Sequence, residues 1–119
     1  MSNNELLDDN RLTLDVSLKS EVLMPLAART GCDMKDLAMM CISFAIERGL
    51  EPLEAEKKDP NNWHANESEP IYRFIALHFN TQTPIRRASE LANAGMLRIR
   101  SRVQSDADLV DVFKIGEAI

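Results

Sequence analysis

The sequence predicts a mainly α-helical fold with one strand near its beginning. Apolar and polar residues alternate strictly over RLTLDVSL at residues 11–18, which is typical of a strand with one buried face. In later stretches the apolar residues recur three and four positions apart, with Gly or Pro at several expected helix ends. With 119 residues, 45% of them hydrophobic and 28% charged, the chain has the composition of a globular protein.

The chain divides into four parts by composition. Residues 1–10 form a polar tail, 11–50 a strand and two helices, 51–69 a linker, and 70–119 a mostly helical module. The linker has dense charge, two prolines and little periodicity. Because units of about 40 to 60 residues bury little apolar surface by themselves, we expect the chain to form an oligomer.

A first helix is expected between Glu21 and Gly31. Ser20 is a suitable N-cap, and Gly31 is placed to end the helix. Pro25 conflicts with this interpretation, because at the fifth helical position its ring presses on the carbonyl of Glu21 and one hydrogen bond is lost. The helix is therefore expected to begin later or to be kinked.

A second helix is expected over residues 34–48. Asp33 can cap it, Asp36 places a carboxylate in its first turn, and Gly49 follows its end. A helix with apolar residues on nearly every side must be buried on every side, and a second copy of the chain is the economical source of the covering surface. The same copy is expected to pair with the strand. The apolar residues are Leu37, Ala38, Met39, Met40, Cys41, Ile42, Phe44, Ala45 and Ile46.

The order strand, helix, glycine turn, helix over residues 10–50 resembles the ribbon-helix-helix proteins. The likeness rests on RLTLDV at its start and GCDMKDLAMMCISFAIERG at its end. This family contains the Arc and Met repressors and many plasmid copy-control and antitoxin proteins. In it two chains intertwine, and their strands form an antiparallel ribbon that enters the major groove. The resemblance implies a sequence-specific DNA-binding homodimer, such as a transcriptional repressor or a plasmid or phage regulator.

Transferred to this sequence, the resemblance implies that Arg11, Thr13 and Asp15 read bases. Arginine can bind guanine through two hydrogen bonds, threonine can contact thymine, and a carboxylate can accept from cytosine. The start of the second helix, at Met34 and Lys35, is expected to approach a DNA phosphate. The implied dimer core consists of Leu12, Leu14, Val16, Leu37, Cys41, Ile42 and Ile46.

The net charge of −5 is unevenly distributed. Residues 1–50 carry −3, residues 51–69 carry −4 and residues 70–119 carry +2. Five arginines lie within residues 84–103, where Glu90 is the only acidic residue: Arg86, Arg87, Arg98, Arg100 and Arg102. They either form a second DNA contact through counterion release or a solvated helix face paired with the acidic linker.

The C-terminal module is expected to begin with a helix from Pro70, with Ile71, Phe74, Ile75 and His78 on one face. A further helix is expected from Pro84, because apolar residues recur at spacings of three and four. Gly95 interrupts that helix, so a strand at 96–103 is the alternative, and residues 107–115 fit a helix or a strand equally well. The module is expected to hold dimers together as a tetramer or to bind a partner protein.

Several functions are not indicated by the residues. Cys32 and Cys41 have neither zinc-ligand nor disulfide-framework spacing, and His64 and His78 match no metal motif. No nucleophile motif or Gly-rich loop is present, so neither an enzyme nor a cofactor is expected. The acidic start is unlike a signal peptide, and no stretch is apolar enough to span a membrane, so a cytoplasmic protein is expected.

A second function remains open beside DNA binding. The chain can be a protein-interaction or assembly module that keeps the ribbon-helix-helix dimer without binding DNA. The acidic residues Asp15, Asp33 and Asp36 favour this alternative, because carboxylates repel phosphates.

Overall fold

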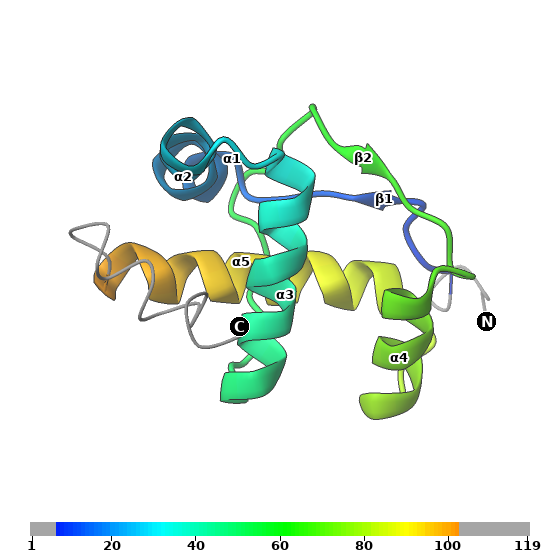
Figure 1. Cartoon of the computed structure of the whole chain (residues 1–119). Helices are drawn as coiled ribbons and strands as arrows, with labels where there is room; N and C mark the ends of the chain where they lie inside the picture. The colour runs from blue at the N-terminus through cyan, green and yellow to red at the C-terminus, as the bar shows by residue number, and fades with distance from the viewer. Residues whose placement is uncertain (1–6, 103–119) are drawn as a thin grey trace.

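The computed structural model describes residues 7–102, without the side chain of Arg102. The predicted mainly helical class is confirmed, and the strands form a two-stranded antiparallel sheet. The elements are β1 (Arg11–Leu12), α1 (Val16–Leu18), the π-helical turn η2 (Lys19–Leu23), α2 (Met24–Thr30), α3 (Met34–Arg48), β2 (Trp63–His64), α4 (Pro70–His78) and α5 (Pro84–Arg102) (Figure 1). Residues 103–119, which include the segment 107–115 expected to be a helix or a strand, lie outside the described residues.

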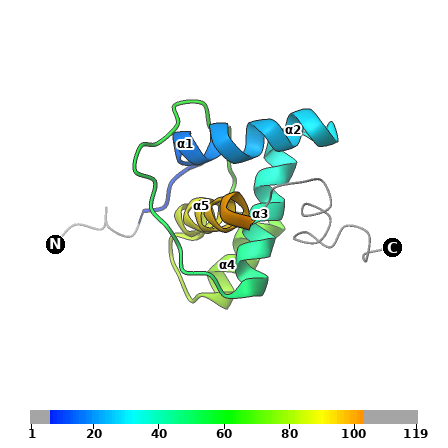
Figure 2. The same cartoon turned by 90° about the vertical axis from the view of Figure 1, so that its left-hand side faces the viewer.

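Helix α5 lies at the centre of the fold. Helix α3 crosses it, α4 packs near its beginning, and the helical run from α1 to α2 lies on the same side of α5 as the two strands (Figures 1 and 2). One cluster of buried side chains includes residues from each of these helices. The parts on either side of the predicted linker therefore share a core. Within residues 7–102, none of the helices is both long enough and apolar enough to span a membrane.

The predicted strand at 11–18 is wrong in length, because only Arg11–Leu12 is a strand. Residues 13 and 14 carry the chain to Asp15, which caps a helix beginning at Val16. β1 pairs with β2, with Arg11 opposite His64 and Leu12 opposite Trp63. The chain thus supplies a partner for its own strand, which the sequence analysis expected from a second copy.

The first helix begins earlier than predicted. Asp15 replaces Ser20 as the N-cap, and the helix widens into the π-helical turn η2 directly before Pro25. A wide turn has room for the ring of a proline and tolerates the lack of its N–H. The helix can therefore continue through Pro25. Gly31 ends α2 as predicted, with a left-handed φ of 73°.

The predicted bounds of the second helix are confirmed. Asp33 occupies the N-cap of α3, and Gly49 follows its end with a φ of 64°. Leu37, Cys41 and Ile42 are buried, whereas Met39 and Met40 are half-buried against the same core. Helix α5 makes the most extensive contact with α3, so the chain itself supplies much of the cover expected from a second copy.

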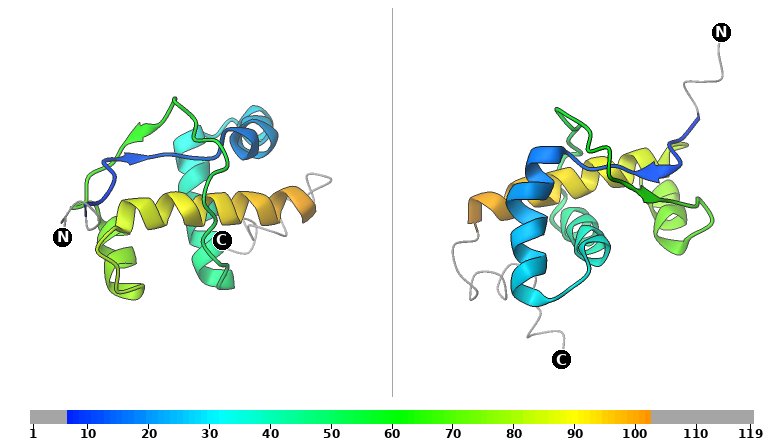
Figure 3. Two further views of the ribbon diagram at one scale, coloured as in Figure 1. Left: turned by 180° about the vertical axis from the view of Figure 1, so that it is seen from behind. Right: turned by 90° about the horizontal axis from the view of Figure 1, so that it is seen from above.

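Helix α5 continues through Gly95, and the alternative of a strand from Met96 is wrong. Figure 3 shows α3 crossing α5 from two further directions. A Cβ at Gly95 would overlap the carbonyl oxygen of Cys41 and lie 3.2 Å from the Cys41 Cβ. Glycine is therefore required by the close approach of the two helices rather than by a break in α5.

The predicted apolar face of α4 is confirmed for Ile75, which is buried, and for Ile71, which packs against the core, but it is wrong for Phe74 and His78. Tyr72 and Ile75 are buried against the rest of the fold, whereas Phe74 is 50% exposed and His78 is also exposed. Helical periodicity alone is compatible with burial of either side of α4, because apolar residues occur on both sides of this helix. The packing of α4 near the start of α5 selects the buried side.

Lys19 fastens the segment before β2 to the first helix. Its ammonium lies 3.3 Å from the Asp59 carboxylate, donates a hydrogen bond to the Asn61 carbonyl at 3.0 Å and lies 5.0 Å from the centre of the Trp63 ring. Lys19 and Asp59 are both buried. These contacts hold β2 beside β1. The two-stranded ribbon of β1 and β2 therefore depends on the charge of Lys19, a residue of η2.

Candidate nucleic-acid interface

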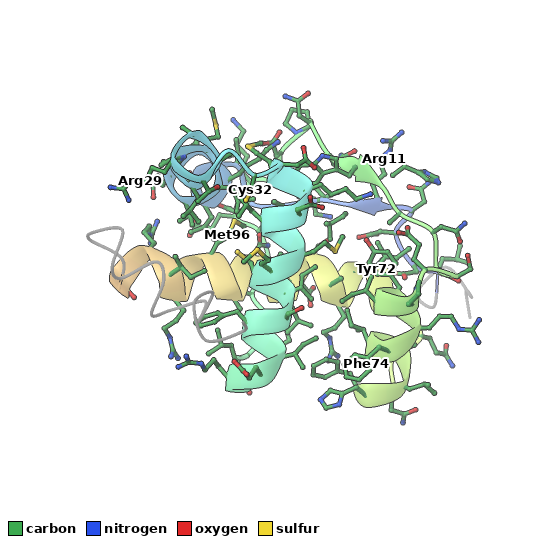
Figure 4. All side chains as sticks on the ribbon, in the orientation of Figure 1. Arg11, Arg29, Cys32, Tyr72, Phe74 and Met96 are labelled. Atoms are coloured by element: carbon green, nitrogen blue, oxygen red, sulfur yellow. The ribbon has the colours of Figure 1, made fainter. Side chains whose placement is uncertain are left out.

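The ribbon of β1 and β2 presents a basic pair to solvent. Arg11 and His64 are cross-strand partners and are both exposed, whereas Leu12 is fully buried and Trp63 is half-buried. Cross-strand partners project from the same face of a sheet. Figure 4 labels Arg11 at this edge of the molecule. Lys57 and Lys58, in the segment that leads to β2, are exposed as well.

Thr13 is half-buried and lies against α5. Its N–H donates a hydrogen bond to the Ser89 hydroxyl at 3.0 Å, and its own hydroxyl donates to the Arg11 carbonyl at 3.4 Å. The predicted base-reading residue is thus held against α5, and its side chain is less accessible than that of Arg11.

The prediction that Asp15 reads bases is wrong. Asp15 is buried, and its carboxylate accepts hydrogen bonds from the backbone N–H groups of Leu18 at 3.0 Å, Glu56 at 2.8 Å and Lys57 at 3.3 Å. Burial by itself raises the pKa of this carboxyl, but the backbone hydrogen bonds outweigh it and hold the pKa below its ordinary value. Asp15 therefore joins the first helix to the segment before β2.

Met34 and Lys35 lie in the first turn of α3 and are half-buried. The neighbouring Asp33 and Asp36 are exposed, and Asp33 makes no side-chain capping bond. Two carboxylates thus stand beside the predicted phosphate contact, where they oppose an anion.

The five arginines predicted as a cluster lie near the two ends of α5. Arg86 donates hydrogen bonds to the Leu7 carbonyl at 3.2 Å and to Asp9 at 3.5 Å, and Arg87 lies over the Phe79 ring. Arg100 forms a 2.7 Å ion pair with Glu21, and Arg98 is exposed. Arg98 lies eleven positions after Arg87, which is a rise of about 16 Å along the helix. The four arginines whose side chains are described therefore form no single patch, and the side chain of Arg102 lies outside the described part of the chain.

The residues predicted for a dimer core are covered by their own chain. Leu12, Leu14, Leu37, Cys41 and Ile42 are each 2% exposed or less, and Val16 and Ile46 are half-buried. All of them except Val16 belong to the core around α5 or pack against it.

A polar cleft of about 270 Å³ lies next to the ribbon. Its lining includes Thr13, Glu54, Lys58, Arg86 and Glu90. Burial and the Glu54 carboxylate raise the pKa of Glu90, and Arg87 and Arg86 oppose this shift only in part. The cleft is thus bordered by charges of both signs, with a carboxylate that is easier to protonate than usual.

Glu90→Gln is expected to raise the melting temperature at pH 7. A carboxyl whose pKa is higher in the folded state loses stability as the pH rises through that raised pKa, and glutamine removes this loss. The gain should shrink at about pH 4, because this pH lies below the ordinary pKa of a glutamate and therefore below the raised pKa of Glu90. Thermal unfolding at both pH values measures it, with the exposed Glu56→Gln as control. An equal gain in melting temperature at both pH values would contradict a raised pKa of Glu90 as its cause.

Two titratable side chains away from the ribbon, Cys41 and Tyr72, are buried. Among residues 7–102 no group of three or more His, Cys, Asp or Glu could hold a metal ion. Burial raises the pKa of Cys41 to about 12. Burial, with the carboxylates of Glu69 and Asp8, raises the pKa of Tyr72 to about 12 as well. Both groups therefore stay protonated at neutral pH and are poor nucleophiles or bases.

His64 is the ribbon residue that sequence reasoning missed. Residues 51–69 have the composition of a linker, so the sequence predicts no strand at this position. The sequence feature that could have indicated a packed segment here is Trp63, a single large aromatic residue within a polar stretch. Its ring packs beneath Lys19. Comparisons of the chain with protein-family models, curated proteins and solved structures gave no match. The fold is a mainly helical one in which a central helix supports a short intrachain ribbon.

Proposed function

We propose that this chain binds double-stranded DNA sequence-specifically, with the exposed face of the β1–β2 ribbon in the major groove. It would act as a transcriptional repressor or as a plasmid or phage regulator. The observation that carries the proposal is the cross-strand pair of Arg11 and His64, both exposed on one face of an antiparallel ribbon. A two-stranded ribbon has a suitable size for the major groove.

The ribbon-helix-helix resemblance supports this mode of reading, with one difference. In that family each of two chains supplies one strand, whereas here β2 occupies the place of the second strand. Arg11 can donate two parallel hydrogen bonds to guanine, and the exposed Lys57 and Lys58 can approach phosphates. Because contacts of lysines with phosphates release counterions, we expect an affinity that falls with salt, and the carboxylates of Asp9 and Glu54 near the ribbon weaken it.

Arg11→Ala is expected to weaken specific binding by about 1 to 3 kcal/mol, because a bidentate base contact is lost. The protein should first be used to select duplexes from a random library, and binding to the selected duplex is then measured by fluorescence anisotropy over a salt series. The matched control is Arg98→Ala, an exposed arginine near the far end of α5.

Two outcomes would contradict reading by the ribbon. If Arg98→Ala weakens binding and Arg11→Ala does not, the end of α5 is the DNA-binding surface. If the wild type shows no salt-dependent binding to any duplex, DNA binding is excluded. The second result would favour the alternative of a protein-interaction module, for which exposed apolar side chains on α4 provide a specific observation.

A further inference from the structure

A groove of about 470 Å³ lies between the last turns of α5 and the segment that follows α3. Leu50, Pro52 and Leu53 line it from the segment after α3, and Ala94 and Leu97 line it from α5. Ala94 is buried, whereas Leu97, one turn later on the same face of the helix, is 39% exposed. The groove, which we call the α5 groove, therefore leaves a large apolar side chain in contact with solvent.

The α5 groove lies next to the point where the described part of the chain ends. Ser101 lines the groove, and α5 ends at Arg102, so residue 103 follows within two positions of the lining. The last turns of α5 extend beyond α3 (Figures 1 and 3). Because residues 103–119 are covalently joined to Arg102, they are held beside the groove at a high effective concentration.

Residues 103–119 combine apolar and acidic side chains. They contain four acidic residues and one lysine, which gives this segment a net charge of −3. Asp108 and Asp111 flank the first part of an apolar run over residues 109–115. The apolar residues of this run are Leu109, Val110, Val112, Phe113 and Ile115. Its composition suits a site that is apolar at its centre and basic at its border.

The border of the α5 groove carries the complementary charge. Arg98 and Arg100 line the groove together with Glu51. Arg100 forms its ion pair with Glu21, whereas Arg98 is exposed and has no ion-pair partner among residues 7–102. An acidic segment that reaches the groove can therefore supply a carboxylate to Arg98.

The chain between α5 and the apolar run is long enough for this contact. Residues 94–101 extend about 10 Å along the axis of α5. Residues 103–108 span up to about 20 Å when extended, which allows the chain to reverse its direction and bring residue 109 back to the groove.

We propose that residues 109–115 of this chain bind in its own α5 groove, with apolar side chains against Leu53 and Leu97 and with Asp108 and Asp111 near Arg98. The contact covers Leu97 and links the end of α5 to the segment after α3. The proposal does not rest on DNA binding, and a failure of one leaves the other standing.

Trypsin cleavage after Lys114 tests the proposal on the full chain, because a peptide bond inside a bound segment is protected from the protease. Intact-mass spectrometry measures the initial rate at which the product of residues 1–114 appears. In the wild type this rate is expected to be at least about 10-fold lower than for the same bond in a synthetic peptide of residues 103–119. Equal rates in the chain and the peptide would overturn the proposal.

Substitutions in the groove identify where the segment binds. Leu97→Glu is expected to raise the cleavage rate after Lys114 to nearly that of the peptide, and Arg98→Glu should raise it in part. Met24→Glu, which alters an exposed apolar residue on α2, should leave the rate unchanged. Circular dichroism verifies that each variant is folded, and the exposed Arg98→Glu provides the test if Leu97→Glu is not.

Two further outcomes would overturn the proposal. Protection of Lys114 that survives in the folded groove variants would mean that residues 109–115 bind elsewhere. Protection that appears only at high protein concentration would mean that the segment binds a second copy of the chain, because a contact within one chain does not depend on concentration.

Discussion

Gly95→Ala is expected to lower the free energy of unfolding by about 3 kcal/mol, although alanine is the better helix former. The added methyl group would overlap the main-chain carbonyl oxygen of Cys41, which α3 holds in its own helix. A carbonyl cannot rotate away as a long side chain can, so α3 and α5 must move apart. Chemical denaturation followed by circular dichroism measures the loss.

Two controls separate this steric effect from others. Gly49→Ala meets no atom within 4 Å but requires a left-handed φ, so it should lose only about 1 kcal/mol. Cys41→Ala should not rescue Gly95→Ala, because the overlapping oxygen belongs to the main chain. A neutral or stabilising effect of Gly95→Ala would mean that the two helices do not approach each other at this residue.

Asp15→Ala is expected to lower the free energy of unfolding by about 2 to 4 kcal/mol. The substitution removes the N-cap of the first helix and leaves the N–H groups of Glu56 and Lys57 without their acceptor. The N–H of Asp15 itself still donates to the Asn93 side chain at 2.9 Å, which involves only the main chain of residue 15. Urea denaturation of the variant and wild type measures the difference.

Asp33→Ala is the matched control, because Asp33 is also an N-cap residue but makes no side-chain capping bond. Its substitution should change stability by less than about 0.5 kcal/mol. Equal losses for the two variants would contradict the role given to Asp15.

The effect of Asp15 should also depend on pH. Since its folded pKa lies below that of the unfolded chain, ionised Asp15 contributes stability above the unfolded pKa of about 4. That contribution is lost as the pH falls through the folded pKa. Asp15→Asn should therefore differ most from wild type near neutral pH, and the difference should diminish in acid. A pH-independent difference would indicate that shape rather than charge matters at this position.

Helix ends were predictable from short stretches of sequence. Gly31 and Gly49 end helices as predicted because a left-handed backbone conformation is nearly free of strain only in glycine. Asp33 begins α3 for a similarly local reason, since it takes the extended conformation of an N-cap. The mainly helical class followed from the same patterns of capping and spacing.

Roles that depend on distant segments were not predictable in this way. Asp15 follows the alternating pattern of a strand, yet it caps a helix because residues 56 and 57 bring two further N–H donors to it. Gly95 has the character of a helix breaker, yet it lies inside α5 because α3 crosses there. In both cases the partner lies about 40 to 55 residues away along the chain, outside any local window.

The candidate interface also depends partly on local sequence and partly on distant segments of the chain. The exposed position of Arg11 follows from alternation around the buried Leu12, which is a property of the local sequence. Its pairing with His64 depends on Lys19, Asp59 and Trp63, which hold a charged segment against the first helix. Local sequence sets the backbone conformation and polarity of each segment. Long-range packing decides which polar groups form hydrogen bonds inside the fold and which stay exposed and able to bind a partner.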